Sequence, residues 1–133
     1  MTNGKTITIA NVMTKSVISV DVTITVNEAA KMMEDAKVGA VIVMENNLPV
    51  GIVTDRDFSV KVVSHAYQIT APVKQIMSSP LVSINSDETV RMAADLMHDR
   101  RIRKIPVIDD GKVVGIITAT DIVNLLAVSV EED

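Results

Sequence analysis

The sequence repeats itself at a shift of 64 residues. Placing residues 12–58 over residues 76–122 without a gap gives 14 identical pairs in 47 positions, and many other pairs are conservative. Two copies are too few for a solenoid, whose stability comes from three or more stacked units. The repeat therefore predicts two small copies that pack about a pseudo-twofold axis. We place them at residues 8–64 and 72–128, with tails at residues 1–7 and 129–133.

Each copy has the pattern of an α/β unit with the element order β-α-β-β-α. Val and Ile together supply 37 of the 133 residues, which favours strands. In the first copy, Thr25 and Glu28 fit a capping box at the start of a helix. The apolar run 38–44 predicts a strand buried on both faces. The other expected elements are a strand at 17–20, a turn at 45–47, a strand at 50–53 and a helix at about 55–64. The helical methionines are expected in the core: Met32, Met33, Met92 and Met97.

Composition removes several classes of function. With no Cys, the chain has no disulfide, thiolate zinc site or Cys nucleophile. The two histidines, His65 and His98, are too few for a histidine metal site, and we expect both in solvent. A net charge of −4 and a pI near 5.1 disfavour general binding to nucleic acids or anionic membranes. No apolar run approaches the roughly 18 residues of a membrane span, and we expect a cytoplasmic protein. No motif carries paired catalytic carboxylates or an activated nucleophile, so we expect no enzyme.

Two heptapeptides carry a family resemblance. GIVTDRD at 51–57 and GIITATD at 115–121 match the G-h-h-T/S-x-x-D signature of cystathionine-β-synthase (CBS) domains. The segment RIRKIPVID at 101–109 resembles that family's basic, apolar, Pro-Val strand, and VMT at 12–14 and IMS at 76–78 match its opening. The chain thus resembles a tandem CBS pair, or Bateman module, over residues 8–127.

The resemblance implies a regulatory module that binds an adenosine-containing ligand. AMP, ADP or ATP is expected, with S-adenosylmethionine or NAD as alternatives, in two clefts between the repeats. It also implies a homodimer and a regulated partner protein in trans, because no catalytic domain accompanies the pair. We expect the helices to supply the dimer's apolar surface, through Val60, Val62, Val63, Ile122, Val123, Leu125 and Leu126.

The Thr and Asp of each heptapeptide admit two compatible interpretations. T-x-x-D before an apolar helix is itself a helix cap. A helix N-terminus also attracts phosphate, and a carboxylate can accept hydrogen bonds from the two hydroxyls of a ribose. The resemblance assigns Thr54 and Thr118 to phosphate and Asp57 and Asp121 to ribose.

The basic cluster at 100–104 also has two interpretations. Cations stabilise a helix C-terminus, which accounts for Arg100 and Arg101. Arg103 and Lys104 begin the next strand, where alternation sends one of them toward the cleft, and the resemblance puts both near phosphate. Their counterparts in the first copy are uncharged, so we expect unequal clefts, with phosphate-holding charge in the second copy.

Half of the candidate site is apolar. Residues such as Val17 and Val38 are core by default, but the resemblance also places such residues around adenine, with the adenine side of each motif built by the other repeat. Thr118 and Asp121 would then act with Val17, Ile18, Val38 and Gly39, whereas Thr54 and Asp57 would act with Pro80, Val82 and Ile102. The full candidate ligand-binding set is Thr118, Thr120, Asp121, Arg103, Lys104, Val17, Ile18, Val38, Gly39, Thr54, Arg56, Asp57, Pro80, Val82 and Ile102.

Two other functions compete with ligand sensing. A dimerisation or docking module for an enzyme or transporter would not need its clefts, but the Thr and Asp pairs of both copies speak against that alternative. Nucleic-acid binding through residues 100–104 is disfavoured by the acidic net charge and by having only two aromatic residues, Phe58 and Tyr67.

Overall fold

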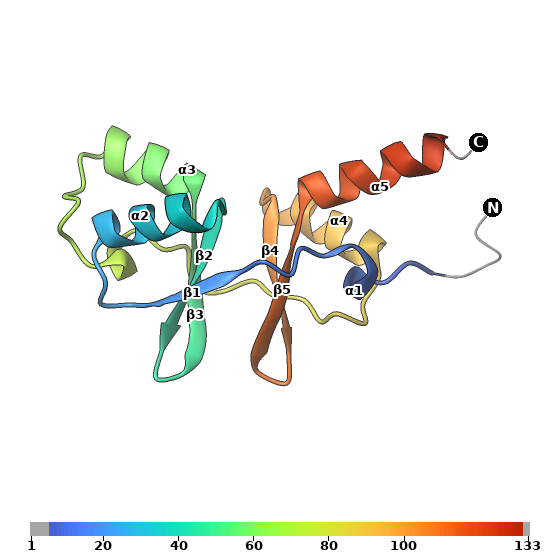
Figure 1. Ribbon diagram of the computed structural model, residues 1–133, viewed down its shortest axis with the longest axis horizontal. Helices are drawn as coiled ribbons and strands as arrows, with labels where there is room; N and C mark the ends of the chain where they lie inside the picture. Colours follow the sequence, from blue (N-terminus) through green and yellow to red (C-terminus); the bar gives the residue numbers. More distant parts are fainter. Residues whose placement is uncertain (1–5, 132–133) are drawn as a thin grey trace. The chain divides into compact units, whose positions relative to one another are not determined.

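The structure, a computed structural model, describes residues 6–131, and side chains through residue 127. It contains two compact units (Figure 1). The continuous unit consists of residues 16–82, and the discontinuous unit joins residues 6–15 to residues 83–131. Of the tails expected from the sequence, residues 1–5 and 132–133 lie outside the described part of the chain. Both units combine strands and helices, which confirms the α/β class.

The continuous unit contains a three-stranded sheet in the order β1-β2-β3. The central strand β2 pairs with β1 in parallel and with β3 in antiparallel orientation. Its elements are β1 (Ile18–Asp21), α2 (Val26–Ala36), β2 (Ala40–Glu45), β3 (Leu48–Thr54), α3 (Asp55–Asp57), η1 (Phe58–Ser64) and η2 (Val73–Gln75). The middle of β2 is buried on both faces, as expected. On one face Val41 and Val43 belong to the core cluster that also contains Met33. Ile42, which points to the opposite face, is also fully buried. The helix expected at 55–64 is α3 continued by the π-helical η1.

The discontinuous unit contains the antiparallel hairpin β4-β5 and three helices (Figure 1). Its elements are α1 (Ile9–Val12), α4 (Val90–Arg100), β4 (Lys104–Asp109), β5 (Lys112–Thr118) and α5 (Ala119–Glu131). The strand expected at the start of the second copy is reduced to a single parallel bridge between Ile84 and Val107. Pro106 stands where the first copy has Ile42, and proline offers no N–H to extend that ladder.

The helix start and the hairpin turn that the sequence predicts in the first copy are both present. Glu28 N donates to Thr25 Oγ1 at 3.1 Å, and Thr25 N donates to Glu28 Oε1 at 3.4 Å, so the capping box is formed. The β2-β3 turn places Asn46 and Asn47 at φ values of 53° and 63°, a backbone that suits a two-residue hairpin.

The helical methionines divide between core and surface. Met33 and Met97 are buried, but Met32 and Met92 are 40% and 51% exposed, so the expectation of a core position is wrong for these two. They lie on the outer side of helices whose inner side is already filled by the buried Ala29 and Ala93. His65 and His98 are exposed, as expected.

Each sheet is completed by a short segment from the beginning of the other copy. Thr14 exchanges two backbone hydrogen bonds of 2.8 Å with Ile116 of β5. Ser78 pairs in the same way with Ile52 of β3, at 2.8 and 3.2 Å. Because these short segments cross beside the Gly-containing strands, they reach the two Thr and Asp motifs.

Candidate functional site

The second motif lies where β5 ends and α5 begins. The backbone N–H of Thr118 donates to Asp121 Oδ2 at 3.0 Å, and the backbone N–H of Asp121 donates to Thr118 Oγ1 at 3.1 Å. This reciprocal pair caps α5, so the capping interpretation of the motif is correct. It also fixes a carboxylate at the positive end of a helix. Thr120, in the first turn, is exposed.

Thr14 is a third member of this motif. Its hydroxyl donates to Asp121 Oδ1 at 3.0 Å and lies 3.2 Å from Oδ2. Thr14 does not belong to the site expected from the sequence. One signal could have found it: the 64-residue shift aligns Thr14 with Ser78, so a hydroxyl follows Met at the same place in both copies.

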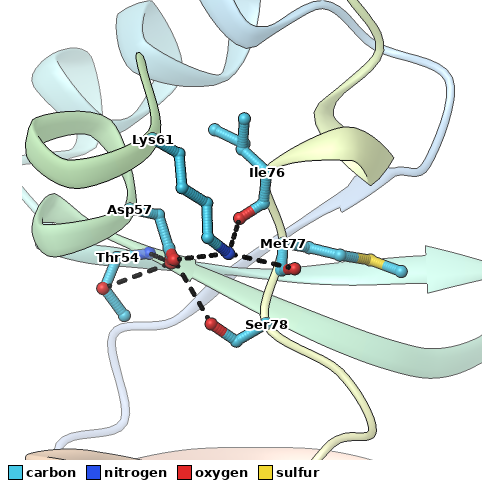
Figure 2. A network of polar contacts seen from close by, with 6 residues as sticks. All are labelled: Thr54, Asp57, Lys61, Ile76, Met77 and Ser78. Carbon is cyan, nitrogen blue, oxygen red and sulfur yellow. Dashed lines mark hydrogen bonds and ion pairs between the residues drawn. The ribbon is translucent and has the colours of Figure 1, made fainter. Parts of the chain in front are cut away.

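The first motif has the same plan with an added cation (Figure 2). The backbone N–H of Thr54 donates to Asp57 Oδ2 at 2.9 Å, and the hydroxyl of Ser78 donates to Oδ1 at 3.2 Å. Lys61 Nζ lies 3.1 Å from Asp57 Oδ1 and donates to the carbonyl of Ile76 at 2.7 Å. Lys61 is also absent from the expected site. Its spacing of four residues from Asp57 could have signalled the pair, because residues four apart face each other on a helix.

The basic cluster extends from the end of α4 to the start of β4. Arg100 ends α4, and Arg101 caps that helix in the left-handed conformation at φ 56°. Arg103 is exposed, and its carbonyl accepts a hydrogen bond of 2.8 Å from the first backbone N–H of α5, that of Ala119. Lys104 is half-buried and lies opposite Thr118 in the β4-β5 register. The discontinuous unit therefore brings Arg103 and Lys104 to the same end of the sheet as the second motif.

The remaining expected residues are distributed over both units. Ile102 is half-buried in the discontinuous unit. In the continuous unit the half-buried members are Val17, Ile18, Val38, Gly39 and Val82, and the exposed members are Arg56 and Pro80. The carbonyl of Gly39 accepts a hydrogen bond of 3.2 Å from Asp55, which places it at the start of the helix that follows Thr54. A ligand-binding role for these residues stays a prediction.

The described part of the chain contains neither a cluster of side chains that could hold a metal ion nor a helix that could span a membrane. Within residues 6–127, no group of three or more His, Asp or Glu side chains is arranged to hold a metal ion. No helix within residues 6–131 is long and apolar enough to cross a membrane.

Comparison with known proteins defines the family. The model of the CBS domain matches residues 9–63 and again residues 73–128. The chain therefore belongs to the CBS-domain family and carries two such domains in tandem. It is 33% identical over 114 residues to the CBS domain-containing protein YhcV of Bacillus subtilis, an alignment that covers 86% of this chain and 81% of the relative.

Solved structures of CBS pairs have the same fold. The CBS domain pair of protein MJ0100, in complex with 5′-methylthioadenosine and S-adenosyl-L-methionine, is similar with a TM-score of 0.84 and 27% identity, over 94% of this chain and 99% of that chain. A hexameric CBS-CP12 protein from bloom-forming cyanobacteria is similar with a TM-score of 0.84 and 32% identity, over 92% of this chain and 73% of that chain.

Proposed function

We propose that this protein is a regulatory module that binds an adenine nucleotide of the AMP, ADP or ATP type and acts on a partner protein in trans, without catalysis of its own. The observation that carries the proposal is the second motif. There a carboxylate, a threonine hydroxyl and a helix N-terminus lie together at one end of a sheet, and the chain positions of Arg103 and Lys104 are at the same end. A nucleotide presents the complementary groups: a ribose diol that donates hydrogen bonds and phosphates that carry negative charge.

The roles follow from the chemistry of each group. Asp121 accepts hydrogen bonds from the two ribose hydroxyls, because a carboxylate has about four acceptor positions. Thr118 and the start of α5 hold phosphate through a hydroxyl and the helix dipole. Arg103 adds a two-pronged charge-assisted contact, and Lys104 adds a point charge. The MJ0100 complexes support the adenosine part of the proposal, since both of their ligands contain it.

Calorimetry with AMP, ATP, S-adenosylmethionine and NAD tests the proposal. We expect Asp121→Ala to weaken AMP binding by about 2–4 kcal/mol, from the loss of hydrogen bonds to a charged acceptor. The control ligand is 2′,3′-dideoxy-AMP, which should bind weakly to the parent protein and no more weakly to the variant. Equal losses for both ligands would identify Asp121 as a helix cap only.

Self-association is a further part of this proposal. Val63 on η1 and Val123 and Leu126 on α5 are 78%, 61% and 59% exposed. Clusters of large exposed apolar side chains mark interaction surfaces. We propose that these helices pair two chains in a homodimer. The location of the protein in the cytoplasm stays a prediction. A ligand-independent docking module would keep these exposed apolar side chains and show no heat with any nucleotide.

A further inference from the structure

Asp57 and Asp121 occupy the same place in the two copies, but the two carboxylates have different neighbours. Asp57 is 6% exposed. Its Oδ2 accepts from the backbone N–H and, at 3.4 Å, from the hydroxyl of Thr54, while its Oδ1 accepts from Ser78 and Lys61. A carboxylate has about four acceptor positions, so those of Asp57 are filled by this protein's own donors.

Fewer of the acceptor positions of Asp121 are filled. Among the described residues, its donors are the backbone N–H of Thr118 and a single hydroxyl hydrogen, that of Thr14, which is shared between both oxygens. About two acceptor positions are left, which is the number that a ribose diol requires. The side chain is also half-buried rather than buried.

One sequence difference accounts for the stronger part of the contrast, and the rest is the 3.4 Å contact from the hydroxyl of Thr54. The 64-residue shift places Leu125 where the first copy has Lys61. Lys61 is four residues after Asp57, and its side chain is 30% exposed. Figure 2 shows its ammonium group between the carboxylate of Asp57 and the carbonyl groups of Ile76 and Met77. Lys61 Nζ is 3.1 Å from Asp57 Oδ1, 2.7 Å from the carbonyl oxygen of Ile76 and 3.5 Å from that of Met77. A leucine at this place supplies neither the charge nor the donors.

We propose that Lys61 is a built-in counter-ion that makes the first motif a structural clamp, so that each chain has one ribose-accepting motif, formed by Thr118 and Asp121. The clamp joins the helix after β3 to the crossing segment at 76–78, through Lys61 and through the hydroxyl of Ser78. A ribose could enter the first motif only by displacing an ammonium group from a buried carboxylate, and separating such a pair is strongly unfavourable. The statement about ligand number rests on the proposed function.

Exchanging the two residues between the copies tests the inference. Leu125→Lys gives Asp121 a cation at the same four-residue spacing, and we expect its AMP affinity to fall by about tenfold or more, the value of a lost hydrogen bond to a charged group. Asn124→Lys is the matched control, because it adds the same charge at the neighbouring exposed position, and its AMP affinity should stay within about twofold. Lys61→Leu should also bind AMP within about twofold, and the parent should bind one AMP per chain.

Thermal melting without ligand measures the clamp separately. Lys61→Leu should lower Tm by about 4–10 °C, because it leaves a buried carboxylate without its counter-ion. Asp57→Asn should also lower Tm, and the double variant should lose less than the two single losses added together.

The outcomes separate the inference from the proposed function. Two AMP per parent chain, or AMP binding weakened as much by Lys61→Leu as by Leu125→Lys, would overturn the inference and leave the proposed function standing. If the Tm loss of the double variant equalled the sum of the two single losses, Lys61 and Asp57 would not act together as a clamp. If the parent bound neither AMP nor S-adenosylmethionine, the proposed function would fail and the single-ligand statement with it, while the melting data would still decide whether the clamp exists.

Discussion

Replacing Gly115 by alanine would place a methyl carbon 2.8 Å from the backbone carbonyl oxygen of Thr14 and 2.9 Å from Met13 Sδ. The carbonyl of Thr14 also accepts a backbone hydrogen bond of 2.8 Å from Ile116, so it cannot retreat without stretching that bond. Overpacking costs about 1–3 kcal/mol, and a weakened hydrogen bond adds about 0.5–1.5 kcal/mol. Alanine recovers about 0.4–1 kcal/mol by restricting the unfolded chain. We expect Gly115→Ala to lower the free energy of unfolding by about 2–3 kcal/mol.

The same substitution at Gly51 should cost less. The nearest atom to the new methyl group is there Met77 Sδ, at 2.6 Å, whereas the backbone oxygen of Ser78 is at 3.0 Å. A methionine side chain is flexible and can turn away, at the cost of about 0.5–1.5 kcal/mol for an unfavourable rotamer. The strain at the Ser78 oxygen, 3.0 Å away, and the about 0.4–1 kcal/mol that alanine recovers by restricting the unfolded chain oppose each other. We therefore expect Gly51→Ala to lower the free energy of unfolding by about 0.5–1.5 kcal/mol.

Urea unfolding followed by circular dichroism measures both losses, and two further backgrounds provide controls. Met77→Ala should remove most of the penalty of Gly51→Ala, because it removes the nearest atom. Met13→Ala should leave most of the penalty of Gly115→Ala, because the carbonyl of Thr14 remains. A larger loss at Gly51 than at Gly115, or a full rescue by Met13→Ala, would refute the reasoning from these contacts.

Three other predictions concern phosphate, acid and assembly. Arg103→Ala should weaken AMP binding by about 1.5–3 kcal/mol, the value of a charge-assisted hydrogen bond, and leave adenosine binding nearly unchanged; calorimetry with both ligands decides, and equal losses would make Arg103 structural. The hydroxyl of Ser86 and, second, its backbone N–H hold the pKa of Asp109 below its usual range. A lowered pKa stabilises the fold above the pKa of the unfolded chain, and this stabilisation is lost as the pH falls through the folded pKa. Ser86→Ala should therefore raise the pKa of Asp109 in an NMR titration, and its stability deficit at neutral pH should shrink in acid; an unchanged pKa would contradict this. Sedimentation at micromolar concentration should show a dimer, and a clean monomer would count against the proposed pairing of helices.

Much of the fold could be predicted because its signals are local. The N-cap of Thr25, the two-residue turn at Asn46 and Asn47, and the doubly buried β2 each depend on residues within a few positions of one another. The strand expected at the start of the second copy could not be predicted from its own residues. Its loss depends on Pro106, which lies in a partner strand and has no N–H to donate.

The sequence by itself determined the repeat, the element order, the family and the Thr and Asp of both motifs. Only the tertiary structure decided what surrounds those carboxylates. Thr14 is 107 residues from Asp121 in the sequence, yet it is one of its donors, and Ile76 and Ser78 reach Asp57 and Lys61 because the crossing segment returns to β3. The periodicity and capping patterns read from a sequence extend over one element, whereas the number of free acceptor positions on a buried carboxylate depends on every segment that the fold brings to it.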